Sequence, residues 1–218
     1  MSDQSHHEPP YFDQRFRDQF LELLAWRRDV REFLTNPLPA GTFEKLVAVG
    51  SLAPSVGLSQ PWRFVVVEDQ ERRAVVRRSF ETCNAAALRC EHGERAMLYA
   101  QLKLAGLNQA PVQFALYADV ATVQGHLLGR RTMPETAMYS AVAAVQTMWL
   151  AARIDGFGMG WVSILDPEEV TAVLDVPDSW VFIGYFCLGY PAHPDDTPAL
   201  QRVGWEHRHE SGEFIIKR

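Results

Sequence analysis

The chain has 218 residues, of which 47% are hydrophobic and 22% charged, and this balance excludes a largely disordered or fibrous protein. Its 21 basic and 27 acidic side chains give a formal net charge of −6, so no nucleic-acid partner is predicted and any phosphate site must be local. No apolar run approaches the ~20 residues of a membrane span, and the three cysteines lack metal-ligand spacing. We therefore expect a cytoplasmic protein with reduced thiols and no membrane partner.

The N-terminal part of the chain predicts a short tail followed by two helices. Residues 1–10 contain little that can pack, so we expect a disordered tail and one domain over residues 11–218. Apolar side chains recur at helical spacing up to Trp26, which predicts an amphipathic first helix. A second helix is predicted from an N-cap at Thr42 to about Leu52.

Three runs of β-branched or continuous apolar residues predict the strands of a small sheet, at residues 63–68, 112–118 and 181–190. Between the first two runs, residues 70–90 and 94–107 are predicted as helices. This mixture indicates a helix-rich α+β or α/β chain.

The longest predicted helix runs from Glu135 to Asp155 with a 3.6-residue apolar period, which is typical of a central core helix. Residues 120–134 before it lack periodicity and are predicted as a loop, and the glycine-rich residues 156–160 after it are expected to end the helix. Asp166, followed by a proline and then by Glu169, predicts the start of a short helix to about Leu174.

Three arginines, Arg27, Arg28 and Arg31, fall within five residues at the exit of the first helix. Because guanidinium groups bind phosphate bidentately, this cluster is a candidate site for one phosphomonoester. The alternative is a solvated helix end whose cations favour the negative end of the helix dipole. Asp29 lies inside the run, either as an ion-pair partner or as a proton acceptor whose pKa the cationic neighbours depress.

A turn over residues 53–64 precedes the first predicted strand. It is either a plain loop or a device that presents Ser55 and Gln60 to the edge of a heterocycle. The sequence has no nucleophile elbow and no P-loop, and the glycines at 156–160 follow a helix rather than a strand, which argues against dinucleotide binding. No metal site is predicted.

Taken together, these segments resemble the FMN-dependent nitroreductase superfamily, in which an Arg-Arg-Ser-x-Arg motif precedes an Ala-Pro-Ser-x-x-Asn-x-Gln-Pro-Trp motif. This chain has Asp29 in place of the serine and Leu58 in place of the asparagine. With Met-Pro-Glu-Thr at 133–136 and Trp-Val-Ser at 161–163, these departures resemble one branch of the superfamily, the BluB-type 5,6-dimethylbenzimidazole synthases. The similarity runs over roughly residues 21–208.

The resemblance implies a nitroreductase-like α+β fold, with a small, mostly antiparallel sheet flanked by helices, a long central helix and a C-terminal arm near residues 214–216 that reaches toward the partner of a homodimer. It implies FMN at the subunit interface, with reduced FMN as the substrate and a separate NAD(P)H-dependent flavin reductase as its supplier. The reaction that the resemblance implies is attack of molecular oxygen on the reduced flavin, whose ring fragment becomes 5,6-dimethylbenzimidazole, the lower ligand of cobalamin, while D-erythrose 4-phosphate leaves.

The resemblance also gives roles to particular residues of this chain. The arginine cluster and Arg208 are implied to hold the FMN phosphate and ribityl chain, Ser55 to hydrogen-bond the flavin, and Leu104 to belong to a lid over it. Asp29 and Ser163 are implied to be catalytic and to flank the reacting part of the ring. The implied flavin-binding residues are Arg27, Arg28, Asp29, Val30, Arg31, Ser55, Leu104, Ser163 and Arg208.

Two other functions stay open at this point. A conventional NAD(P)H-dependent FMN nitroreductase or quinone reductase needs room above the flavin for nicotinamide and turns over many times on one FMN. A flavin-binding module without activity explains the arginines and Ser55 but gives Asp29 no role. Ser163 has a plainer interpretation as a structural turn residue, and the segment around Leu104 has one as an ordinary core helix.

Overall fold

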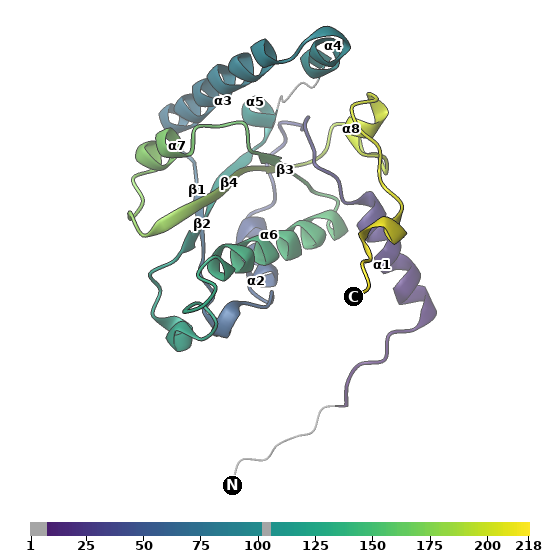
Figure 1. Cartoon of the computed structure of the whole chain (residues 1–218), viewed down its shortest axis with the longest axis vertical. Helices are drawn as coiled ribbons and strands as arrows, with labels where there is room; N and C mark the ends of the chain where they lie inside the picture. Colours follow the sequence, from purple (N-terminus) through teal and green to yellow (C-terminus); the bar gives the residue numbers. More distant parts are fainter. Residues whose placement is uncertain (1–7, 102–105) are drawn as a thin grey trace.

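The computed structural model describes residues 8–101 and 106–218, and it has a four-stranded sheet between two layers of helices (Figure 1). The strand order is β1-β2-β4-β3, and every neighbouring pair is antiparallel. The small antiparallel sheet flanked by helices is the architecture that the sequence predicts. The strands are β1 Trp62–Val66, β2 Val112–Asp119, β3 Gly158–Val162 and β4 Trp180–Gly189.

The helices cover both faces of the sheet. One face packs against α2 and the long helix α6, and the other packs against α3, α5 and α7 (Figure 1). Alternate side chains of β2 divide between the two cores, with Phe114 and Leu116 on the α6 side and Ala115 and Tyr117 on the α3 side. The α-helices are α1 Gln14–Trp26, α2 Thr42–Gly50, α3 Gln70–Cys90, α4 Gly93–Gln101, α5 Gly106–Gln109, α6 Thr136–Ile154, α7 Pro167–Leu174 and α8 Ala199–Arg202. The 3-10 turns are η1 Val56–Leu58, η2 Gln124–Leu127 and η3 Ser211–Phe214.

The three predicted strands are confirmed as β1, β2 and β4, and residues 156–160 follow the end of α6 as predicted, but a fourth strand was missed there. Those glycines do more than end α6, because β3 begins at Gly158 and forms an edge of the sheet. A Cβ atom on Gly160 would lie 2.2 Å from the Val30 carbonyl oxygen, and one on Gly158 would lie 2.6 Å from Val30 Cγ2. The glycines therefore admit the segment around Val30 against the edge strand.

Most predicted helices are confirmed, with differences at their ends. The N-cap of α2 is Gly41, with φ of 77°, rather than Thr42, whose buried side chain makes no capping bond. The helix predicted over 94–107 is helical where it is described, as α4 and α5, and residues 102–105, including Leu104, lie outside the described residues. Asp166 caps α7 as predicted, since its carboxylate accepts from the backbone N–H groups of the second and third helical residues.

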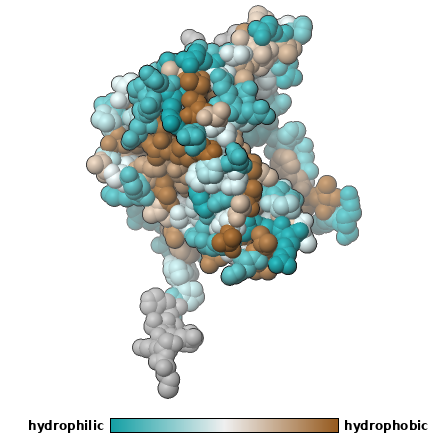
Figure 2. Space-filling view, turned by 90° about the vertical axis from the view of Figure 1, so that its left-hand side faces the viewer, coloured by the Kyte–Doolittle hydropathy of each residue, from teal (hydrophilic) through white to brown (hydrophobic). Residues whose placement is uncertain are grey.

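Apolar side chains remain uncovered on α1 and near the C-terminus. None of the residues of α1, all of which the structure describes, is buried, and Phe16 and Phe20 are exposed. Phe214 and Ile216 are about 70% exposed. The face of the molecule that carries α7 also mixes apolar patches with polar surface (Figure 2). Across the part of the chain that the structure describes, no helix combines the length and apolar character needed to cross a membrane.

Candidate functional site

The segment after α1 lies alongside the edge strand β3. Val30 N donates to Met159 O at 2.9 Å, and Asp29 pairs with Met159 in a parallel bridge. The Asp29 side chain adds a third connection, because its Oδ1 accepts from Trp161 N at 2.8 Å. The carboxylate is therefore fixed at the edge of the sheet, and the exposed Ser163 follows two residues after Trp161, directly beyond the end of β3. Ser163 thus follows the strand that holds Asp29, although it does not line the cavity beside the arginines that Asp29 lines.

The electrostatics of Asp29 differ from the expectation. Its Oδ2 lies 3.8 Å from Arg31 Nε, too far for a strong ion pair, and the side chain keeps 40% of its accessible surface. Burial of the carboxyl group by the surrounding chain raises its pKa, and this effect outweighs the Trp161 N–H and the charges of Arg31 and Arg27, which lower it. The prediction that the pKa of Asp29 is depressed was wrong, because it took account of the neighbouring cations but not of the desolvation of the carboxylate, which raises the pKa. A carboxylate with a raised pKa is a stronger base, which suits a proton acceptor.

The three clustered arginines have different surroundings. The Arg27 guanidinium lies over the Trp149 ring, 5.5 Å from its centroid, and the buried Nε atoms of Arg27 and Arg31 have no hydrogen-bond partner among the described residues. Arg28 donates from Nε to Asp196 O at 2.7 Å and from Nη1 to Arg27 O at 2.8 Å. Arg27 and Arg31 therefore carry donors that a bound anion would satisfy, whereas Arg28 also holds the local backbone in place.

Arg208 lies on the same side of the molecule as the cluster. The pKa of Arg28 is lowered, first by burial and then by the positive charges of Arg208 and Arg27, while Asp196 raises it. Like charges raise each other's free energy unless an anion lies between them. An anion between the two guanidinium groups would offset this repulsion, although Arg208 does not line the cavity beside the cluster.

A cavity of about 240 Å³ opens beside this cluster. This volume is below the roughly 300–1,000 Å³ of most ligand pockets. Trp149 and Arg153, from the C-terminal part of α6, were missed as site residues, although the helical period already placed Trp149 on the core face of that helix. Trp149 Nε1 donates to Arg28 O at 3.2 Å, so α6 helps to hold the backbone of the arginine cluster in place. The basic and aromatic lining consists of Trp26, Arg27, Arg28, Arg31, Trp149, Arg153, Phe157, His193 and Arg202.

Ser55 lies at the other end of α6. The next residue, Val56, donates its N–H to Ser140 Oγ at 3.1 Å, whereas Trp149 contacts the arginine cluster nine residues later. At ~1.5 Å per residue, these two points on α6 are about 14 Å apart along the helix axis. Ser55 does not line the cavity beside the arginines, so this chain does not bring Ser55 and the cluster into one pocket.

Leu104 falls outside the described residues, so its implied place in a lid stays a prediction. Near the end of α4, Tyr99 Oη donates to Asn84 Oδ1 at 2.9 Å. Burial and the charge of Glu91 raise the pKa of Tyr99, while the charge of Arg31 lowers it. Among the described residues, no three His, Cys, Asp or Glu side chains gather as a metal site would require.

Comparisons with known proteins identify the family of this chain. The model of the nitroreductase family matches residues 24–190. A 5,6-dimethylbenzimidazole synthase of Rhodospirillum rubrum is 53% identical over 199 residues, which cover 91% of this chain and 94% of that protein. A 5,6-dimethylbenzimidazole synthase of Rhodobacter capsulatus is 44% identical over 195 residues, which cover 89% and 94%.

Among solved structures, oxidised iodotyrosine deiodinase bound to FMN and 3-iodo-L-tyrosine matches with a TM-score of 0.70 and 22% identity, over 91% of this chain and 97% of that chain. At this identity the likeness is one of fold. It confirms the fold class that the sequence predicts.

Proposed function

Because the chain belongs to the nitroreductase family, we propose that it binds FMN and catalyses the oxygen-dependent fragmentation of reduced FMN to 5,6-dimethylbenzimidazole, the lower ligand of cobalamin, and D-erythrose 4-phosphate. The relatives at 53% and 44% identity are named for synthesis of this benzimidazole. The observation that carries the proposal is the Asp29 carboxylate, which the Trp161 N–H holds at the edge strand in the wall of the cavity lined by Arg27, Arg28 and Arg31.

The residues around the cavity fit FMN. The buried Nε atoms of Arg27 and Arg31 lack protein partners among the described residues, and a phosphate would supply acceptors for them. We assign Arg27, Arg28, Arg31 and Arg208 to the phosphate and ribityl chain, and the Val30 backbone to the wall beside them. Bound in its reduced form, FMN supplies both the electrons that activate oxygen and the carbon skeleton of the product.

Asp29 and Ser163 are the proposed proton-transfer groups. Asp29 Oδ1 is engaged by the Trp161 N–H, so Oδ2 is the atom left to accept a proton from the ribityl carbon or the ring. The exposed hydroxyl of Ser163 is a second group able to donate or accept a proton at the same strand end. Leu104 is proposed to belong to a lid that excludes water from the reduced flavin.

A homodimer completes the proposed site. The cavity of one chain is smaller than most ligand pockets, and Ser55 is about 14 Å along α6 from the arginine contact. We therefore propose that Ser55 reaches the flavin held by the arginines of a second copy. The exposed apolar side chains of α1 and of residues 214–216, the proposed C-terminal arm, are suited to burial against that copy.

A separate NAD(P)H-dependent flavin reductase is the proposed supplier of reduced FMN, and the proposed location is the cytoplasm. Cys83, Cys90 and Cys187 are free thiols, which suits a reducing compartment. Burial raises the pKa of Cys187 to about 12, so this thiol is a core group rather than a nucleophile.

One experiment tests the reaction against its alternatives. FMN bound to the purified protein is reduced without oxygen, air is admitted, and the products are separated. Formation of 5,6-dimethylbenzimidazole, with one FMN consumed for each product molecule, is expected. Recovery of intact FMN together with rapid oxidation of NADH would favour a conventional reductase, and intact FMN without NADH oxidation would favour a binding module.

A further inference from the structure

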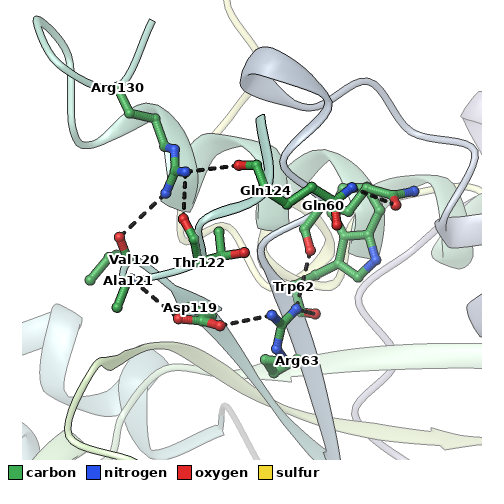
Figure 3. A network of polar contacts seen from close by, with 9 residues as sticks. All are labelled: Gln60, Trp62, Arg63, Asp119, Val120, Ala121, Thr122, Gln124 and Arg130. Atoms are coloured by element: carbon green, nitrogen blue, oxygen red, sulfur yellow. Dashed lines mark hydrogen bonds and ion pairs between the residues drawn. The ribbon is translucent and has the colours of Figure 1, made fainter. Parts of the chain in front are cut away.

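Arg130 is a buried cation surrounded by backbone carbonyl groups (Figure 3). It is 6% exposed, and its Nη1 donates to Val120 O at 3.3 Å, while its Nη2 donates to Thr122 O at 2.6 Å and to Gln124 O at 3.0 Å. None of the ion pairs between described residues includes Arg130. Because a buried charge needs compensating polar groups, these three carbonyls and the guanidinium hold one another in place.

The turn that follows these carbonyls has a backbone conformation that L residues rarely adopt. Gly125, His126 and Leu127 have φ of 77°, 50° and 60°. Left-handed conformations are unfavourable for the histidine and the leucine, so the local sequence alone does not favour this turn. The hydrogen bonds from Arg130 to the residues that lead into this turn stabilise its conformation.

The turn η2 in turn supports η1, the turn that begins after Ser55. Gln124 Nε2 donates to Leu58 O at 2.8 Å and to Gln60 Oε1 at 3.2 Å. The backbones are close enough that a Cβ atom on Gly125 would lie 2.3 Å from the Gly57 carbonyl oxygen. A shift of η2 therefore shifts η1.

Gln60 connects these turns to Ser55 through hydrogen bonds. Gln60 N donates to Ser55 Oγ at 3.1 Å, which leaves the serine hydroxyl hydrogen free to point at a ligand. Arg63 holds the same peptide from the other side, since its Nη1 donates to Gln60 O at 3.1 Å and its Nη2 donates to Asp119 Oδ2 at 2.7 Å (Figure 3). Asp119 ends β2, directly before the segment that Arg130 holds.

We propose that Arg130 is a positioning residue for flavin binding: acting through Gln124 and Gln60, it sets the place and direction of the Ser55 hydroxyl. The inference rests on the proposed FMN site, and it adds a residue that none of the flavin-facing motifs contains. Arg130 itself donates to carbonyls of its own chain, so its effect on the flavin must pass through Ser55.

A double-mutant cycle with oxidised FMN as the probe tests this route. The variants are Arg130→Lys, Gln124→Ala and Ser55→Ala, with Arg131→Lys as the matched control on the exposed neighbouring arginine. The readouts are the dissociation constant of FMN and its bound absorption spectrum. Arg130→Lys and Gln124→Ala are each expected to weaken binding about tenfold and to shift the spectrum, because Ser55 loses its alignment. In the Ser55→Ala background the same changes are expected to cost less than about twofold.

The outcomes separate this inference from the proposed function. Equal losses in the two backgrounds, or unchanged binding in Gln124→Ala, would overturn the role of Arg130 while leaving the FMN site intact. Absence of FMN binding by the unaltered chain would overturn both. If Arg130→Lys does not fold, Gln124→Ala decides the question, because Gln124 is an exposed side chain whose loss leaves the core unchanged.

Discussion

Replacement of Asp29 by asparagine separates the position of this side chain from its ability to take a proton. The asparagine Oδ1 is able to accept the same 2.8 Å bond from Trp161 N, so the segment stays paired with β3. The neutral amide cannot accept the proton that the mechanism requires. Loss of one general base typically costs about 10²–10⁴-fold in rate, which corresponds to about 2.7–5.5 kcal/mol in the activation barrier.

The effect of Asp29→Asn on stability is expected to be small and to favour the variant near neutral pH. The folded chain has a raised Asp29 pKa, so it binds this proton more tightly than the unfolded chain does, and the ionised carboxylate lowers stability above the folded pKa. That cost disappears below the unfolded value of 3.8. Loss of the long, partly exposed contact with Arg31 changes stability by only about 0–1 kcal/mol.

The assay is a single turnover of reduced FMN with oxygen, with product yield and rate measured beside melting temperature and FMN affinity. Asp155→Asn, which removes one exposed carboxylate at the end of α6, is the matched control and is expected to make product at the normal rate. In the unaltered enzyme the rate is expected to fall on the acid side with a pKa above 3.8. An Asp29→Asn variant that makes the benzimidazole at a near-normal rate would refute the assignment of Asp29 as the base.

Three further predictions concern binding, packing and assembly. Arg27→Ala is expected to weaken FMN binding about 10- to 100-fold and riboflavin binding much less, because the lost bond is to phosphate; equal losses in titrations of both ligands would place Arg27 elsewhere. Gly160→Ala is expected to destabilise the fold by about 1–3 kcal/mol in denaturant unfolding and to weaken FMN binding in titration, because its Cβ would meet the Val30 carbonyl oxygen at 2.2 Å. Gly212→Ala, which has open space around its Cβ, is the control and should change neither quantity. Sedimentation is expected to show a homodimer, and a monomer with full activity would contradict the shared site.

The strands that the sequence predicted correctly are those whose own residues bury apolar side chains. β2 and β4 are central strands with nearly continuous apolar sequences, and each was recognisable by that property. The sequence did not predict β3, because two of its five residues are glycines, which local rules interpret as a turn. Its reason for being a strand is tertiary: the segment around Val30 needs a partner without side chains.

The candidate site shows a similar division. The charges of the arginine cluster and the unusual carboxylate at Asp29 were visible in the sequence, because residue type and spacing alone carry that information. The direction of the Asp29 pKa was not, since it depends on how much surrounding chain replaces water around the group. Arg130 was likewise unassigned, because its partners are carbonyl groups, which every residue has and which no sequence pattern distinguishes.

The same edge strand explains why a carboxylate is useful at position 29. The Trp161 N–H holds the Asp29 side chain at one oxygen, and the shorter side chain of a serine would place its single oxygen one bond closer to the backbone. Only the aspartate has a second oxygen, and only its protonation state responds to burial. Binding of FMN beside Asp29 would remove more water, and this would raise its pKa further, while the FMN phosphate is neutralised by the arginines. On the proposed mechanism, an aspartate at position 29 therefore gives the site a proton acceptor that a serine would lack.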